Sequence, residues 1–197
     1  MAEGELQSDP LRQFERWFAA AGEAGVDVPE AMALATATPA GRPSARMVLL
    51  KGADERGFVF HTNYESRKGH ELAANPQAAL LFHWRPLGRQ VRVEGHVERL
   101  GEGESAAYFR TRPRASRIAA WASPQSRPLR DRRELERLFA EAAERHPGNE
   151  IPLPPHWGGF RLVPDAYEFW EHGDDRLHDR VRYESDGAGW SKTRLAP

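Results

Sequence analysis

Short apolar runs separated by turn residues make up most of this chain. A run such as residues 78–84 is too short for a buried helix and is bounded by turn signals, which is typical of a strand. Val91, Val93 and Val97 share one face of the next run, and Gly95 interrupts it where we expect a β-bulge. The pattern predicts strands over residues 31–37, 44–51, 58–63, 78–84, 89–100, 159–163, 167–170, 177–183 and 190–195.

Two of these runs, residues 44–51 and 58–63, flank a short Gly-bearing turn and predict a β-hairpin. Ser66 follows and predicts the N-cap of a short helix that ends before Asn75-Pro76. A second helix start is indicated by Asp9-Pro10, a capping residue followed by a first-turn proline. We expect helices over residues 10–21, 66–74, 102–110, 114–122 and 131–145.

This order of elements favours an antiparallel β-barrel with helices packed outside it, a mainly β class with some α structure. A doubly wound sheet is disfavoured because the chain has neither an alternating βαβ pattern nor a Gly-rich dinucleotide loop. The length of 197 residues suits one domain. We expect a polar, disordered tail over residues 1–8 and a single domain over residues 9–197.

Composition narrows the class of function. Lys and Arg number 28 and Asp and Glu 29, so the formal net charge of -1 supplies no general field for nucleic acid or an anionic membrane. The absence of cysteine excludes thiol catalysis and Cys-ligated metals, and it fits a cytoplasmic protein. No apolar run reaches the ~18 residues of a membrane span. The histidines show no metal-binding spacing, so we expect no metal site.

Arg67 and Lys68 stand in the first turn of the expected helix at residues 66–74. Cations there oppose the helix dipole, whereas a bound anion would make them favourable. An exposed, solvated pair is the alternative, and the two interpretations are about equal on this feature. Arg46 and Lys51 shift the balance toward an anion site, because they bracket an apolar run that a core would fill without charge.

A second candidate anion site lies at residues 108–117, where four arginines cluster. Tyr108, Arg112 and Ser116 are spaced so that they can converge around a turn at the start of a helix. Arginine suits bidentate contact with phosphate. A basic surface loop or a weak RNA contact would account for the same residues.

The segment around residues 176–180 has the period of a strand. In a strand, Arg176, His178 and Arg180 would share one face, and Leu177 would point the other way. Such a face is costly to desolvate unless an anionic ligand lies against it. A solvated edge strand is the alternative.

These motifs, in this order, resemble the pyridoxine/pyridoxamine 5′-phosphate oxidase family. The likeness begins at the run Arg46-Met47-Val48-Leu49-Leu50-Lys51 followed by Ser66-Arg67-Lys68, and extends over nearly the whole chain from about Asp9. It continues through Gln90, residues 108–116, Gln125-Ser126, residues 176–180 and residues 194–197. The resemblance implies a split, Greek-key β-barrel that binds FMN at a homodimer interface.

The resemblance also implies residue roles. The cofactor would be bound by Arg46, Met47, Val48, Leu49, Leu50, Lys51, His61, Thr62, Arg67, Lys68, Gln90, Gln125, Ser126, Trp170 and Arg180. The phosphate of a B6 substrate would be bound by Lys51, Tyr108, Arg112 and Ser116, with Arg176 and His178 holding its ring against the flavin as the catalytic pair. The implied reaction oxidises pyridoxamine or pyridoxine 5′-phosphate to pyridoxal 5′-phosphate, with O₂ as acceptor and H₂O₂ as product.

Three departures from the family pattern concern the substrate. No Arg-Arg-Glu-Tyr-type segment precedes Asp9, His61 stands where tyrosine is usual, and Glu171-His172 replace Gln-Gly. They keep open a flavin oxidase that acts on a phenazine-type intermediate, although the phosphate-binding set around Arg112 argues against it. A non-catalytic carrier of flavin or B6 phosphate also fits these residues. A nucleic-acid binder fits them more weakly, because the net charge is close to zero.

Overall fold

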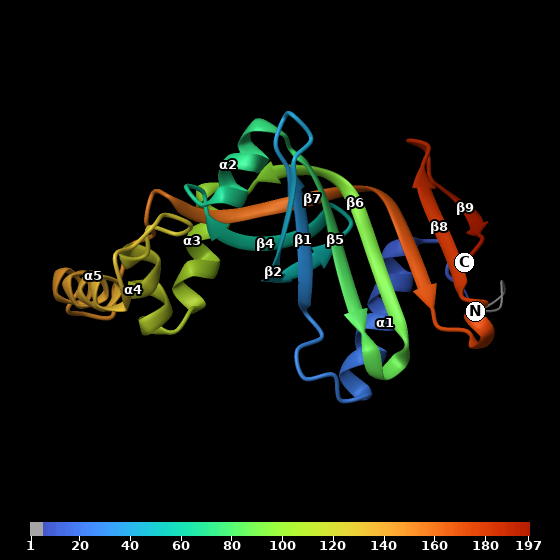
Figure 1. Cartoon of the computed structure of the whole chain (residues 1–197), viewed down its shortest axis with the longest axis horizontal. Helices are drawn as coiled ribbons and strands as arrows, with labels where there is room; N and C mark the ends of the chain where they lie inside the picture. The colour runs from blue at the N-terminus through green and yellow to red at the C-terminus, as the bar shows by residue number, and fades with distance from the viewer. Residues whose placement is uncertain (1–5) are drawn as a thin grey trace.

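The computed structural model describes residues 6–197, in which nine strands form one curled antiparallel sheet (Figure 1). The strand order is β2-β1-β5-β6-β7-β4-β3, with β8 paired to β7 and β9 to β8. The strands are β1 (Ala31–Ala37), β2 (Pro43–Leu49), β3 (Gly52–Asp54), β4 (Gly57–Asn63), β5 (Gln77–Trp84), β6 (Arg89–Arg99), β7 (Trp157–Glu171), β8 (Asp179–Ser185) and β9 (Trp190–Leu195).

Helices lie around this sheet, as the sequence predicts. They are α1 (Pro10–Glu23), α2 (Arg67–Ala74), α3 (Glu102–Thr111), α4 (Arg114–Ala122) and α5 (Arg132–Arg145), with short 3₁₀ turns η2 (Arg85–Leu87) and η3 (Asp174–Arg176). Both predicted N-caps are confirmed: Asp9 accepts from the Leu11 N–H, and Ser66 accepts from the Gly69 N–H. Helix α5 lies at the opposite end of the molecule from β8 and β9 (Figure 1).

The main core forms where α1 packs on the sheet. Phe14 of α1 contacts Phe58 edge-on at 4.8 Å between ring centroids and Phe82 at 5.0 Å. Trp17, one turn further on, meets Phe169 at 90° and 5.3 Å. A smaller cluster around Phe109, Ile118, Ala142 and Trp157 joins α3, α4 and α5 to the start of β7.

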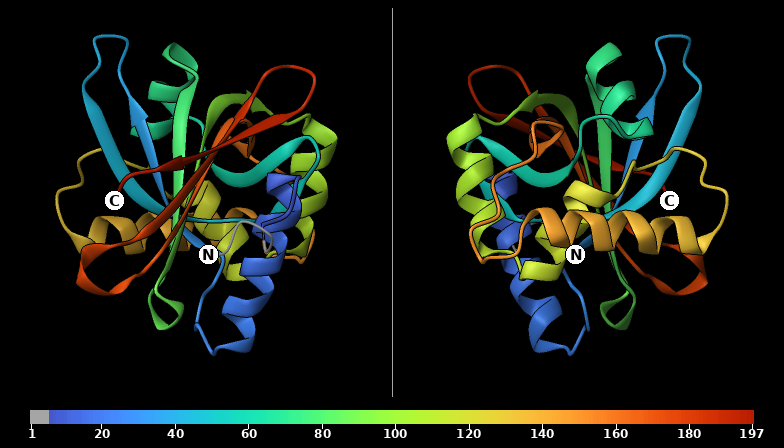
Figure 2. Two further views of the ribbon diagram at one scale, coloured as in Figure 1. Left: turned by 90° about the vertical axis from the view of Figure 1, so that its right-hand side faces the viewer. Right: turned by 90° about the vertical axis from the view of Figure 1, so that its left-hand side faces the viewer.

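The hairpin predicted between residues 44–51 and 58–63 is confirmed only beside its turn, where β3 pairs with β4, and is wrong for residues 44–49. β2 pairs with β1 through the turn at residues 38–42, whereas β4 pairs with β3 and β7. The chain leaves the β1 side of the sheet and joins the β4 side directly after β2. The Leu50 N–H still donates to Glu30 O, just before β1, whereas the Lys51 N–H donates to Val59 O of β4. The chain therefore passes from one pairing partner to the other at these two residues. The tips of the β1–β2 and β8–β9 hairpins lie well apart (Figure 2).

Three other expectations change. The strands predicted at residues 159–163 and 167–170 form one continuous strand, β7, and the strand predicted at 177–183 begins only at Asp179. Residues 1–5 of the expected disordered tail lie outside the described residues. Residues 6–8 are ordered, because Leu6 packs against the core and Gln7 O accepts from the Tyr183 hydroxyl.

The predicted bulge at Gly95 is confirmed by a shift in the β6–β7 register between Glu94 and Gly95. A Cβ atom at Gly95 would lie 2.0 Å from Val163 O and 2.9 Å from Pro164 Cα. The backbone of a central strand can move away from such a contact only at a large cost in free energy.

We therefore expect Gly95→Ala to lower the free energy of unfolding by about 1–3 kcal/mol, as typical overpacking does. Gly103→Ala is the control, because a Cβ there meets nothing within 4 Å and alanine favours the α3 helix. Urea denaturation followed by circular dichroism measures both. Equal stability of the two variants would contradict the packing argument.

Candidate functional site

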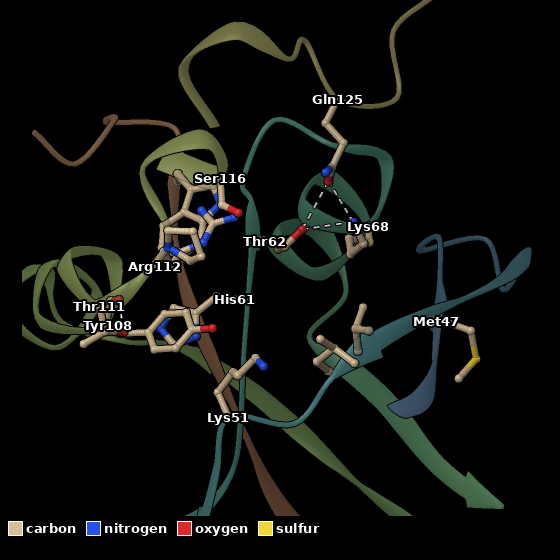
Figure 3. Close-up of a pocket in the computed structure, with 14 residues that line it drawn as sticks. Met47, Lys51, His61, Thr62, Lys68, Tyr108, Thr111, Arg112, Ser116 and Gln125 are labelled. Carbon is tan, nitrogen blue, oxygen red and sulfur yellow. Dashed lines mark hydrogen bonds between the residues drawn. The ribbon is translucent and has the colours of Figure 1, made fainter. Parts of the chain in front are cut away.

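A cavity of about 550 Å³ opens between β2, β4, the start of α2 and the α3–α4 junction (Figure 3). Its wall combines apolar side chains of β2 with basic and hydroxyl side chains from the helices. The lining residues are Met47, Val48, Leu49, Lys51, His61, Thr62, Lys68, Tyr108, Thr111, Arg112, Pro113, Ser116, Gln125 and Trp157. No carboxylate is among them, so the cavity suits an anion.

Lys68 reaches the cavity from the first turn of α2. Its ammonium donates to Thr62 Oγ1 at 2.9 Å and to Gln125 Oε1 at 2.8 Å (Figure 3). Burial, and then the positive charge of Arg46, lower the pKa of Lys68 to about 8. An anion beside this ammonium would reverse that shift, because opposite charge favours the protonated form.

Arg112 lies between α3 and α4, with its guanidinium stacked over Trp157 at 4.6 Å. Its Nη1 is buried and has no hydrogen-bond partner in the described part of the chain. Burial lowers the pKa of Arg112, and Tyr108 opposes that shift. A buried, unpaired guanidinium nitrogen is costly, and a bound anion would satisfy it.

His61 lies beneath Tyr108, with their ring centroids 4.0 Å apart, and 5.3 Å from the Trp157 ring. Neither ring nitrogen of His61 has a hydrogen-bond partner among residues 6–197. Burial first, and then the charges of Arg112 and Lys51, lower its pKa to about 4. His61 is therefore neutral near pH 7 and adds no charge to the cavity.

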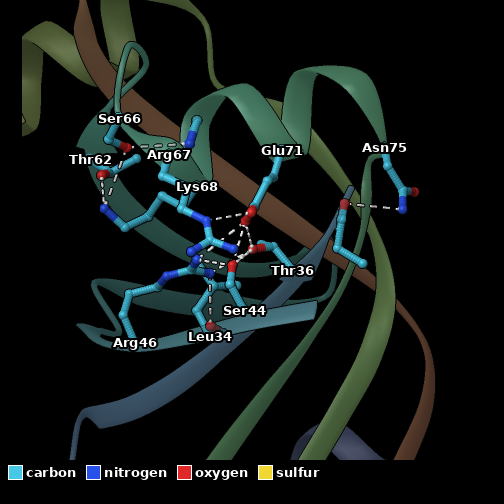
Figure 4. A network of polar contacts seen from close by, with 12 residues as sticks. Leu34, Thr36, Ser44, Arg46, Thr62, Ser66, Arg67, Lys68, Glu71 and Asn75 are labelled. Atoms are coloured by element: carbon cyan, nitrogen blue, oxygen red, sulfur yellow. Dashed lines mark hydrogen bonds and ion pairs between the residues drawn. The ribbon is translucent and has the colours of Figure 1, made fainter. Parts of the chain in front are cut away.

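Arg46 and Arg67 are not in the cavity lining but converge on Glu71, which stands on α2 three residues after Lys68 (Figure 4). Burial raises the pKa of Glu71, but hydrogen bonds from Ser44, Thr36 and Arg67 outweigh it and lower the pKa to about 2. Glu71 was missed by sequence reasoning. Its spacing of four residues from Arg67 is the signal that could have identified it.

Several predicted site residues lie at the far end of the sheet. Gln90 is opposite Trp170 in the β6–β7 register, and Trp170 is opposite Arg180 in the β7–β8 register. Arg180 donates through Nε to Glu168 at 2.8 Å. His178 packs on Trp170 at 4.7 Å between ring centroids, and its Nδ1 accepts from the Gly173 N–H.

The expectation that Arg176, His178 and Arg180 share one face of a strand is wrong. Arg176 ends the turn η3, where Asp175 and Arg176 have φ values of 51° and 64°. Two consecutive non-glycine residues in the left-handed region are unusual and cluster at functional sites. The turn brings Arg176 and His178 to the same end of the sheet without placing them on a common strand.

β7 separates the two groups of residues. Trp157 at its start lines the cavity, and Trp170, thirteen residues on, contacts His178. At ~3.3 Å per residue this is roughly 40 Å of strand. Leu50, Gln90, Ser126, Trp170, Arg176, His178 and Arg180 are the other predicted site residues outside the cavity lining. Trp157, Thr111 and Pro113 line it without having been predicted.

Two family models match this chain. Residues 19–146 match pyridoxamine 5′-phosphate oxidase, and residues 157–197 match the pyridoxine 5′-phosphate oxidase C-terminal dimerisation region. A pyridoxine/pyridoxamine 5′-phosphate oxidase of Rubrobacter xylanophilus is 57% identical over 197 residues, which are 100% of this chain and 91% of that protein. One of Rhodospirillum rubrum is 58% identical over 96% of each chain.

Solved structures agree on the fold. PhzG from Burkholderia lata, in complex with tetrahydrophenazine-1-carboxylic acid, superposes with a TM-score of 0.93 at 40% identity, covering 98% of this chain and 95% of that one. A pyridoxamine 5′-phosphate oxidase-related, FMN-binding protein from Nostoc punctiforme has a TM-score of 0.77 at 20% identity, covering 98% and 100%. The predicted split barrel with peripheral helices is confirmed.

Within residues 6–197 no helix has the length and apolar character needed to cross a membrane. The same residues contain no group of three or more His, Cys, Asp or Glu side chains arranged to hold a metal ion.

The environment of His61 makes a prediction that needs no ligand. Histidine-ring NMR should show His61 titrating at about 4, and Arg112→Ala should raise that pKa by removing a nearby charge and part of the burial. Arg110→Ala, on the exposed side of α3, is the control. Because the unfolded chain binds this proton at about pH 6.5, His61 should reduce stability as pH falls from about 6.5 to 4. Titration of His61 near 6.5 in the unmodified protein would refute the prediction.

Proposed function

Because the chain belongs to the pyridoxamine 5′-phosphate oxidase family, we propose that it is an FMN-dependent oxidase of pyridoxamine or pyridoxine 5′-phosphate. The product is pyridoxal 5′-phosphate, with O₂ as acceptor and H₂O₂ as by-product. The observation that carries the substrate assignment is the cavity with three cations, Lys51, Lys68 and Arg112, and no carboxylate.

The substrate phosphate would bind at the Arg112 end of the cavity. Arg112 offers a buried, unpaired Nη1, and Tyr108 and Ser116 offer hydroxyl groups from neighbouring turns. Lys51 adds charge from the chain segment that leaves β2. A phosphate dianion accepts charge-assisted hydrogen bonds from several donors at once, and such bonds are roughly twice as strong as those to a neutral acceptor.

The residues present fit an FMN group at the other side of the same cavity. Lys68, Thr62 and Gln125 would hold its phosphate end together with Arg67, and Met47, Val48 and Leu49 offer an apolar surface for a ring. Arg46 has only its Nε–H left for a ligand. When bound, the flavin supplies the hydride-accepting chemistry that no side chain of this chain provides.

Arg176 and His178 would orient the substrate ring. In neutral His178, acceptance by Nδ1 of the Gly173 N–H leaves the proton on Nε2, which can then donate to a ligand. These residues lie roughly 40 Å along β7 from the cavity of their own chain. We therefore propose that a second copy of the chain supplies them, together with Gln90, Trp170 and Arg180, which lie at the same end of the sheet. Ser126 follows Gln125, which lines the cavity, and would act from the same chain as Gln125.

Oxidation of a phenazine-type compound is the second candidate, favoured by the likeness to PhzG. A carboxylic acid ligand carries one charge and fewer acceptor oxygens than a phosphate monoester, so it would leave more of the cavity's donors unpaired. Oxygen consumption with pyridoxamine 5′-phosphate, pyridoxamine and a tetrahydrophenazine carboxylic acid separates the candidates. Turnover of the phenazine compound alone would overturn the B6 assignment.

Arg112→Ala should raise the KM for pyridoxamine 5′-phosphate about 30- to 150-fold, the effect of losing a charged contact of ~2–3 kcal/mol. FMN affinity, measured by quenching of flavin fluorescence, should change little. Arg110→Ala, outside the cavity lining on the same helix, is the matched control. An unchanged KM for Arg112→Ala would show that the substrate phosphate does not bind at this end of the cavity.

The shared site predicts complementation between chains. Arg112→Ala and Arg176→Ala should each be weakly active as homodimers. Mixed dimers formed by refolding the two together contain one site with both arginines intact, so they should recover up to about half of the unmodified activity per dimer. Absence of recovery in verified mixed dimers would place both arginines in one chain's site.

A further inference from the structure

Glu71 is a buried acid in a region that is otherwise basic. Its side chain is 6% exposed, and its Oε2 accepts from Thr36 Oγ1 at 2.5 Å and from Ser44 Oγ at 2.6 Å. The same oxygen lies 3.2 Å from Arg46 Nη2, and Oε1 accepts from Arg67 Nε at 2.8 Å (Figure 4). The carboxylate therefore joins β1, β2 and α2 through one group.

The two arginines are used differently. Arg46 donates through Nη1 to Leu34 O and Thr36 Oγ1, and through Nη2 to Ser44 Oγ and Glu71. Four of its five N–H groups are thus spent within the protein. Arg46 serves chiefly as the counter-charge that allows Glu71 to be buried, since an uncompensated buried carboxylate is costly.

Arg67 uses one of its five N–H groups within the described residues. Its side chain is 54% exposed, and Nε is its one hydrogen-bonding atom within the described residues. The four N–H groups on its two terminal nitrogens remain for a ligand. A long exposed side chain loses rotamer entropy when it is fixed. The bond to Glu71 meets part of that cost before any ligand binds.

We propose that Glu71 is a positioning residue: it fixes Arg67 through Nε so that the two terminal nitrogens are presented to the phosphate of FMN. The inference rests on the proposed function, since it takes FMN as the ligand. Electrostatics alone gives the opposite expectation, because removal of a negative charge should strengthen the binding of an anion. A loss of affinity on removing that charge therefore distinguishes positioning from simple charge balance.

Glu71→Gln keeps the size of the side chain and removes its charge. We expect it to weaken FMN binding to the apoprotein about tenfold, as followed by fluorescence quenching. Riboflavin, which lacks the phosphate, should bind both proteins equally. In an Arg67→Ala background the same change should have no further effect on FMN, because the group that Glu71 orients is gone. A purely structural role would weaken both flavins and persist in that background.

Arg67→Lys is a second test that does not depend on the folding of the Glu71 variant, because it alters only an exposed side chain and keeps its charge. A lysine cannot both bind Glu71 and present a planar pair of nitrogens, so FMN should bind several-fold more weakly. Unchanged or tighter FMN binding by Glu71→Gln or Arg67→Lys overturns the inference. If those variants keep FMN affinity while the unmodified protein binds FMN and oxidises pyridoxamine 5′-phosphate, only the inference fails. Failure of the unmodified protein to bind FMN removes the proposed function as well.

Discussion

The length of β7 is the constraint on which the rest of this structure depends. This 15-residue strand pairs with β6, β4 and β8, so nearly every strand of the sheet is placed relative to it. Trp157 at its start stacks with Arg112, and Trp170 near its end packs on His178. A strand held on both edges cannot fold back to bring its ends together. The separation of the two groups of residues is therefore a property of the sheet, and the proposed second copy of the chain would unite them.

Positive charge is unpaired in the cavity, whereas it is paired with a carboxylate in the cluster of Glu71, Arg46 and Arg67. In the cavity, Lys68 and Arg112 are desolvated without an acidic partner, which lowers the pKa of each. In the cluster around Glu71, its carboxylate neutralises the charge of Arg46 and forms an ion pair with Arg67. Unpaired buried donors gain most from an anionic ligand, while a restrained arginine gains from reduced entropy loss. Both arrangements concentrate positive charge locally, so a chain with a net charge of -1 can still offer the anion site proposed here.

Local features of the fold were predictable and long-range pairing was not. The Ser66 cap and the Gly95 bulge follow from residue type, and the convergence of Arg112 with Tyr108 and Ser116 follows from spacing across one turn. Gly-bearing turns flank β2 on both sides, at residues 38–42 and 53–57, so residue types do not decide which neighbouring strand it pairs with, and the pairing of β4 with the distant β7 has no local signal. The turn at Arg176 escaped prediction because no glycine marks its left-handed backbone.

Selectivity between a phosphate and a carboxylate ligand follows from the donors that each would leave unpaired. A site that satisfies its buried donors through a ligand rejects an analogue lacking the matching acceptors far more strongly than an apolar pocket rejects a missing methylene group. Arg112 Nη1 is such a donor, and Tyr108 and Ser116 lie in the same cavity wall. A common fold with PhzG therefore does not imply a common substrate. Under the proposed function, the donors of Arg112, Tyr108 and Ser116 at the α3–α4 junction would select the phosphate, and the apolar surface of β2 would contribute nothing to that choice.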